Sequence, residues 1–92
     1  MIVRILSEGQ YRLDSMYLDR LNEIDNRLVS VVADGSDEEF RTLFEQMLAL
    51  VREHGQAVPA EELVTSDVVL PDPNSHIDDI KPLFVGEGLV PG

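Results

Sequence analysis

The sequence predicts a small α+β fold, in which a small antiparallel sheet, formed by an N-terminal β-hairpin and a short third strand, packs against an α-helical hairpin and is followed by a short C-terminal helix. Polar and apolar residues alternate through residues 1–13, apolar residues recur at helical spacing through 14–55, and 68–70 form an apolar run beside turn-forming residues. A chain of 92 residues has material for one hydrophobic core. We therefore expect a single domain over 1–92, in which 56–92 form an acidic region of strand, short helix and tail.

The first residues of the chain have the pattern of a β-hairpin. Val3 and Ile5 alternate with residues of the opposite face, and Ser7-Glu8-Gly9 supplies turn chemistry. Tyr11 and Leu13 then continue the alternation. These four apolar side chains are expected on the buried face of the sheet, because the side chains of a strand point alternately to its two faces.

A first helix is predicted after the hairpin. The period changes at Asp14-Ser15, where either residue can cap a helix by accepting a hydrogen bond from an amide of the first turn. The helix is expected to end at Asp34-Gly35, because glycine readily takes the left-handed conformation common at helix C-termini. Its apolar stripe follows spacings of four and three residues and consists of Tyr17, Leu21, Ile24, Leu28 and Val31.

A second helix is predicted to begin at Ser36-Asp37-Glu38-Glu39. This is a capping box, in which Ser36 and Glu39 each satisfy a backbone N–H of the other, and its acidic residues suit the positive end of the helix dipole. The helix should end near His54 and Gly55. Because the linker between the two helices is short, they are expected to pack antiparallel. The second apolar stripe contains Phe40, Leu43, Phe44, Met47, Leu48 and Val51.

The last part of the chain, residues 56–92, carries seven acidic groups and a single lysine. The run 68–70 predicts a third strand that pairs with the hairpin. Asn74-Ser75 is expected to cap a short helix over 76–80, which Pro82 ends or kinks. The tail is expected to dock in part on the rest of the protein, because three of its side chains favour burial: Phe84, Leu89 and Val90.

Both helices carry more apolar residues than one packing face needs. The simplest interpretation is that the additional residues widen the core. The alternative is that the helical hairpin adds to the coiled coil of a partner or self-associates. The additional residues are Met16, Leu18, Val29, Val32 and Leu50.

Seven basic against eighteen acidic side chains give a net charge of −11. Nucleic-acid binding and direct membrane binding are not expected, because nucleic acids and anionic lipids both attract basic surfaces. The charge instead favours solubility or attraction to a basic partner. The chain has no cysteine, so disulfides, zinc ribbons and cysteine nucleophiles are excluded. The apolar N-terminal run is too short for a signal sequence or a membrane span, so a cytoplasmic location is expected.

No catalytic residue, cofactor site or metal site is predicted. His54 is expected at a helix end, where a cation interacts favourably with the helix dipole, and His76 in the first turn of a short helix. Acidic residues are adjacent at 37–39, 61–62 and 78–79. Carboxylates that follow each other on a helix point in different directions, so they do not converge on a cation by themselves.

Several segments follow one another in an order and spacing that is distinctive as a set. They are Met1-Ile2-Val3-Arg4-Ile5, Glu8-Gly9-Gln10-Tyr11, the paired helices, Ser66-Asp67-Val68-Val69-Leu70-Pro71 and Gly88-Leu89-Val90-Pro91-Gly92. Together they resemble the PspA-associated (PspAA) family of the phage shock protein system. The resemblance implies a small bacterial or archaeal cytoplasmic protein linked to phage shock protein A, a coiled-coil protein that acts on stressed membranes. It implies no catalytic motif and no cofactor.

The resulting prediction is a non-enzymatic adaptor or regulatory protein that binds a PspA-type coiled-coil membrane-stress protein in an envelope stress response, and that this partner recruits to the inner face of the membrane. The alternative is a small self-associating ligand-binding or regulatory domain, whereas a hydrolase or metal enzyme built on the two histidines is least favoured. A basic partner surface would be contacted by the clustered acidic residues, which are Glu38, Glu39, Glu61, Glu62, Asp78 and Asp79.

Overall fold

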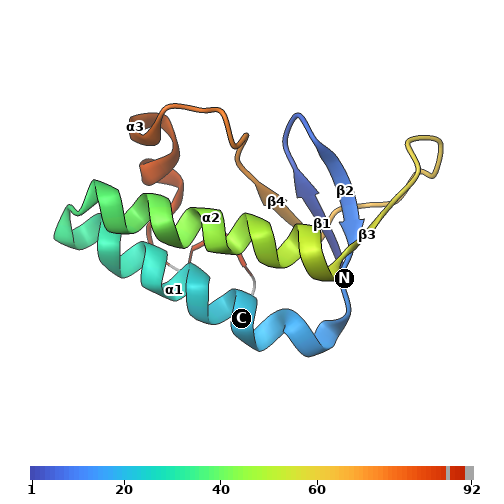
Figure 1. Ribbon diagram of the computed structural model, residues 1–92, viewed down its shortest axis with the longest axis horizontal. Coiled ribbons are helices and arrows are strands. Elements are labelled where there is room, and N and C mark those ends of the chain that lie inside the picture. Colours follow the sequence, from blue (N-terminus) through green and yellow to red (C-terminus); the bar gives the residue numbers. More distant parts are fainter. Residues whose placement is uncertain (87, 91–92) are drawn as a thin grey trace.

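The computed structural model describes residues 1–86 and 88–90, and over these residues the chain forms one sheet, three α-helices and two short 3₁₀ helices, η1 and η2. In chain order the elements are β1 (Ile2–Ile5), β2 (Gly9–Arg12), η1 (Ser15–Tyr17), α1 (Leu18–Asp34), α2 (Asp37–His54), β3 (Gln56–Ala57), β4 (Val68–Leu70), α3 (Ile77–Ile80) and η2 (Lys81–Leu83). Figure 1 shows α1 and α2 side by side as a hairpin, with the sheet beside the end of α2 and α3 nearer its start. Glu87, Pro91 and Gly92, which belong to the acidic region and to the closing segment of the resemblance, lie outside the described residues.

The sheet has the strand order β3-β2-β1-β4. The predicted hairpin is confirmed: β1 and β2 pair antiparallel, with Val3 opposite Tyr11 and Ile5 opposite Gly9. Val3 and Ile5 are buried and Tyr11 is half-buried on the face toward the helices. The predicted third strand also pairs with the hairpin, through β1.

The expectation of an antiparallel sheet is wrong in one respect, because β4 runs parallel to β1 and the sheet is mixed. The reason is β3, which the sequence prediction missed. β3 adds antiparallel to the outer edge of β2 and therefore runs in the same direction as β1. It has only two residues, both exposed, so it leaves no alternating pattern in the sequence. The chain must then return along the sheet before β4 begins, and β4 enters parallel to β1.

Residues 58–67 make this return across the face of the sheet opposite the helices. The side chain of Gln10 donates to the Val64 carbonyl at 2.9 Å and to Ser66 Oγ at 2.8 Å. At the far side the Asp67 carboxylate accepts a hydrogen bond from the Ile2 amide at 2.7 Å. One side chain and one backbone amide of the hairpin thus fix a connection that has no regular structure of its own.

The end of α1 and the start of α2 lie where the sequence predicts them, whereas the predicted cap before the first helix starts η1, and α1 itself begins at Leu18 without a side-chain cap. Asp14 accepts from the Met16 amide at the start of η1, and the Ser36 hydroxyl accepts from the Glu39 amide at the start of α2. Gly35, with φ of 84°, ends α1 in the left-handed conformation. Of the predicted α1 stripe, Tyr17 and Ile24 are only half-buried, whereas the α2 stripe is buried throughout.

The core lies between the helices and one face of the sheet. Phe84, from the chain after η2, is fully buried and meets Phe40 and Phe44 of α2 edge-on, with ring centroids 5.5 and 6.3 Å apart. Edge-to-face contacts of this kind add to the stabilisation from buried area. The remaining apolar core residues are Ile2, Val3, Ile5, Leu13, Leu21, Leu28, Val31, Leu43, Met47, Leu48, Leu50, Val51, Val68, Leu70, Ile80 and Val90.

The C-terminal helix is present but is capped differently from the prediction. Its N-cap is His76, whose Nδ1 accepts from the Asp78 amide at 3.2 Å, so neither Asn74 nor Ser75 fills this role. The backbone amide of Asn74 instead donates to the Asp72 carboxylate, in the turn that precedes α3. The α-helix ends at Ile80, and Pro82 lies within η2, as expected of a residue that cannot continue an α-helix.

The tail is held by a buried carboxylate that the sequence prediction did not single out. Asp25, in the middle of α1, has no exposed surface and accepts hydrogen bonds from the amides of Leu89 at 3.0 Å and Val90 at 2.9 Å. Gly88 has φ of +79°, and a Cβ at this position would overlap the Asp25 carboxylate. The expected docking of the tail is therefore confirmed for Phe84 and Val90, which are buried, and Leu89 is half-buried.

Asp25→Asn is expected to destabilise the protein by about 1–3 kcal/mol, because an amide presents one carbonyl oxygen to two buried N–H groups. Urea unfolding at neutral pH measures the change. Glu23→Gln makes the same chemical replacement at an exposed position of α1 and should change stability by less than about 0.5 kcal/mol. Equal stability of the two variants would show that the Asp25 carboxylate does not hold the tail.

Candidate functional site

The six acidic residues predicted to contact a partner do not form one surface. Residues 38–39 lie in the first turn of α2 and 78–79 in the first turn of α3. These two groups are close to each other, because Lys81 pairs with Asp37 at 2.6 Å. Residues 61–62 lie in the connection between β3 and β4, at the far end of a molecule that is 40 Å long (Figure 1).

All six of these acidic residues are exposed, and two of the groups have basic neighbours of their own. Glu62 pairs with Arg12 at 3.1 Å, and Asp78 lies 3.8 Å from the Lys81 ammonium. The hydrogen bond to Asp37 raises the pKa of Lys81 above its ordinary value, so the lysine stays charged. The acidic groups therefore lie at two ends of the molecule and do not converge on one site.

A groove of about 440 Å³ lies between α1 and α2 and is open to solvent. Its floor is apolar: Ile24 comes from α1, and Ala49 and Leu50 come from α2. Ala49 is small, so it leaves room between the two helices. The other residues that line the groove are polar or charged: Arg20, Glu23, Arg27, Gln46, Glu53 and His54.

Four charged side chains along this groove have no ion-pair partner within 4 Å in the part of the chain that the structure describes. Arg20, Glu23 and Arg27 belong to α1, and Glu53 belongs to α2. Their charges are free to pair with an incoming molecule. Of the surplus apolar residues, Leu50 alone borders the groove, and it is itself buried in the core, whereas Leu18, Val29 and Val32 are half-buried against the core; the simplest interpretation of the surplus is therefore confirmed for these four.

His54 lies at the end of α2, as predicted, whereas His76 is the N-cap of α3 and not a residue of its first turn. His54 closes the last turn of α2 and stacks on Tyr17, with ring centroids 4.5 Å apart and planes 19° apart. His76 caps α3, at the other end of α2. Within residues 1–86 and 88–90, no group of three His, Cys, Asp or Glu side chains is placed to hold a metal ion.

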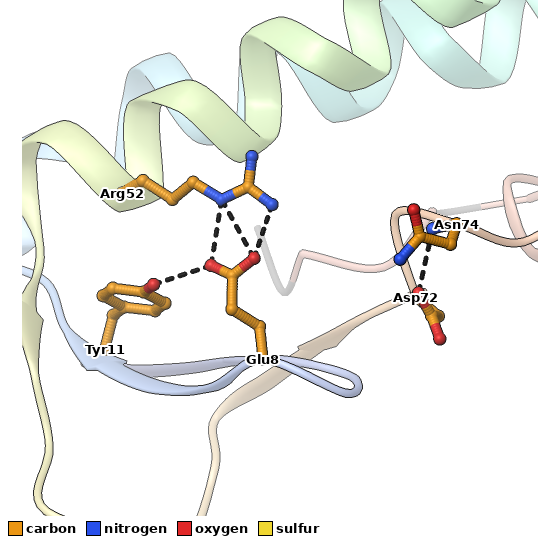
Figure 2. Close-up of polar contacts among 5 residues, drawn as sticks. All are labelled: Glu8, Tyr11, Arg52, Asp72 and Asn74. Atoms are coloured by element: carbon orange, nitrogen blue, oxygen red, sulfur yellow. Dashed lines mark hydrogen bonds and ion pairs between the residues drawn. The ribbon is translucent and has the colours of Figure 1, made fainter.

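A polar cluster fixes the tip of the β-hairpin to α2. Glu8, in the turn between β1 and β2, accepts from Arg52 Nε at 2.9 Å and also contacts the Nη2 group of the same guanidinium. The Tyr11 hydroxyl donates to Glu8 at 2.6 Å. Figure 2 shows both side chains pointing at one carboxylate. The paired donors of a guanidinium match the two oxygens of a carboxylate, so this contact fixes orientation as well as distance.

The hydrogen bonds from Arg52 and then from Tyr11 lower the pKa of Glu8 from 4.5 to about 2. The same contact raises the pKa of Tyr11, because ionisation of the phenol would place a second negative charge beside the carboxylate. Glu8 is therefore ionised at every pH at which the protein is expected to work. The cluster holds the end of α2, and with it one end of the groove, against the sheet.

Together the fold and the groove describe a small α+β protein that carries a helical hairpin on one face of a mixed sheet and leaves the outer side of that hairpin open. The family model of PspAA, the PspA-associated protein, matches residues 1–92. The chain belongs to this family. Comparison with curated proteins and with solved structures finds no match. Among the helices that the structure describes, none has the length and apolar character needed to cross a membrane.

Glu8→Gln is expected to lower stability at neutral pH and to weaken the acid sensitivity of the fold. The pKa of Glu8 in the folded state lies below the ordinary value of 4.5, so its ionised form stabilises the fold above pH 4.5, and this contribution is lost as the pH falls toward 2. Urea unfolding at several pH values should show the stabilities of wild type and variant converging over this interval. Glu45→Gln, on an exposed position of α2, is the control. A constant difference between wild type and Glu8→Gln would contradict the assigned pKa.

Proposed function

We propose that this protein is a non-enzymatic adaptor or regulator that binds a PspA-type coiled-coil protein in an envelope stress response. The observation that carries the proposal is the match of the PspA-associated family to the whole chain. The proposal places the protein in the cytoplasm, where its partner brings it to the inner face of the membrane. Its own contact with the lipid is indirect, because its charge of −11 disfavours anionic membrane surfaces.

Charge and shape support this proposal. Opposite potentials speed the encounter of two proteins and fix their orientation, so the acidic ends of the molecule favour a partner with basic surfaces. The helical hairpin offers an open groove with an apolar floor, and coiled-coil proteins present long amphipathic helices that can enter such a groove.

A second candidate function is a small self-associating ligand-binding or regulatory domain. The groove supports it, because its volume of about 440 Å³ is comparable to that of small-molecule sites. In this case two copies would bring their helical hairpins together and enclose a ligand between them.

Titration of the protein into a PspA-type protein from the same genome should give a dissociation constant of about 1–10 μM at low salt, corresponding to roughly −7 to −8 kcal/mol. Affinity should fall as salt is raised, because salt screens the attraction between exposed charges. Isothermal calorimetry measures both quantities. Sedimentation of the protein alone tests the second candidate, which requires a dimer. The adaptor proposal fails if the two proteins do not associate at about 50 μM in low salt, a concentration that would detect binding several-fold weaker than predicted.

A further inference from the structure

We propose that the groove between α1 and α2 is the partner site, and that it accepts one amphipathic helix of the PspA-type coiled coil. This inference rests on the proposed function and names the surface that would carry it. The occupant would lie along the hairpin and complete a bundle of three helices, with its apolar stripe on Ile24, Ala49 and Leu50.

The spacing of the groove residues fits a helix. On α1 the lining residues follow the series 20, 23, 24, 27, and on α2 the series 46, 49, 50, 53, 54. Positions three and four apart lie on one side of an α-helix, so the lining residues of each helix form one continuous strip along the groove. Because the helices are antiparallel, Arg20 lies toward the His54 end and Arg27 toward the Gln46 end. The strips form two walls along which a third helix can pack.

The charges of the groove specify the chemistry of the occupant. The α1 wall carries Arg20 and Arg27 with Glu23 between them, and the α2 wall carries Glu53. Within the described residues none of these four forms an ion pair, whereas Arg12, Arg52 and Lys81 all do. A helix that meets them would therefore have acidic residues opposite the two arginines and basic residues opposite the two glutamates. Charged residues on both sides of an apolar stripe are typical of coiled-coil helices.

The groove is already formed in the free protein. The inner faces of both helices are buried in the core, and Glu8 holds the last turns of α2 through Arg52. The Tyr17–His54 stack joins the start of the hairpin to its end. Binding therefore needs little ordering of the hairpin, and ordering of interface groups is one of the main costs of association.

The acidic end formed by the first turns of α2 and α3 has a different part in this interaction. Side chains of residues 38–39 and 78–79 are exposed, and the attraction that they exert on a basic partner acts at a distance and accelerates encounter. The groove would determine where the partner helix settles. The two contributions can be separated, because an added negative charge should strengthen the first and, inside the groove, weaken the second.

Arg27→Glu and Arg41→Glu form a matched pair for this separation. Both replace an exposed arginine that has no ion-pair partner in the described chain, on α1 and α2 respectively, and both make the net charge more negative by the same amount. Arg27 lines the groove and Arg41 does not. In the calorimetric titration with the PspA-type protein, Arg27→Glu should weaken binding about tenfold, corresponding to roughly 1.4 kcal/mol, and Arg41→Glu should leave affinity unchanged or slightly higher.

Ala49→Trp and Ala33→Trp test the floor of the groove. A tryptophan at position 49 would fill the space that the partner helix needs, so binding should be lost, whereas Ala33 is exposed on α1 outside the groove and its replacement should leave binding intact. Circular dichroism and thermal unfolding verify that each variant keeps its fold. The arginine pair provides an independent test if a tryptophan variant is destabilised.

The outcomes of these titrations are distinguishable. If the wild type binds the PspA-type protein, and Arg27→Glu and Arg41→Glu bind it with equal affinity, the groove assignment is overturned and the adaptor function stays intact. Absence of binding by wild type would overturn the adaptor function itself. A wild-type dimer that Ala49→Trp converts to a monomer would show that a second copy of the chain, rather than the partner, fills the groove.

Discussion

The inner faces of α1 and α2 are committed to the core, and the rest of the structure depends on this constraint. A chain of 92 residues can build only one modest core, and here the sheet supplies one side of it and both helices the other. Leu21, Leu28 and Met47, for example, are fully buried in this packing and are not accessible to a partner. The outer side of the hairpin carries Ile24, Ala49 and charges that have no ion-pair partner in the described part of the chain, and this is the surface that we assign to a partner helix.

Polar contacts between residues far apart in the sequence complete the fold. Glu8 and Arg52 are 44 positions apart, as are Asp37 and Lys81, and Asp25 reaches the tail 64 positions later. The contacts of Glu8 and Lys81 are partly open to solvent and act chiefly by fixing orientation. Asp25 differs, because its carboxylate is fully buried and satisfied by two backbone amides. It explains why a glycine occupies position 88.

The sequence predicted the elements whose signal is local. Alternation at Val3 and Ile5 identified the hairpin, and the caps at Ser36 and Gly35 located the turn between the helices. What it missed depends on long-range geometry: the two-residue β3, the parallel entry of β4 and the pairing of Asp25 with the tail. The predicted acidic residues do not form one site, because the fold places 61–62 at one end of the molecule and the other two groups near the start of α2. The groove forms only where the two helices pack side by side, so no local pattern in the sequence predicts it.

An NMR titration of the isotopically labelled protein with a coiled-coil fragment of a PspA-type protein tests the groove assignment directly. If the groove binds the fragment, the largest amide shift changes should fall within residues 20–27 of α1 and 46–54 of α2, which contain the groove-lining positions. Changes confined to the connection 58–67 and to α3, with the amides of α1 and α2 unaffected, would contradict it.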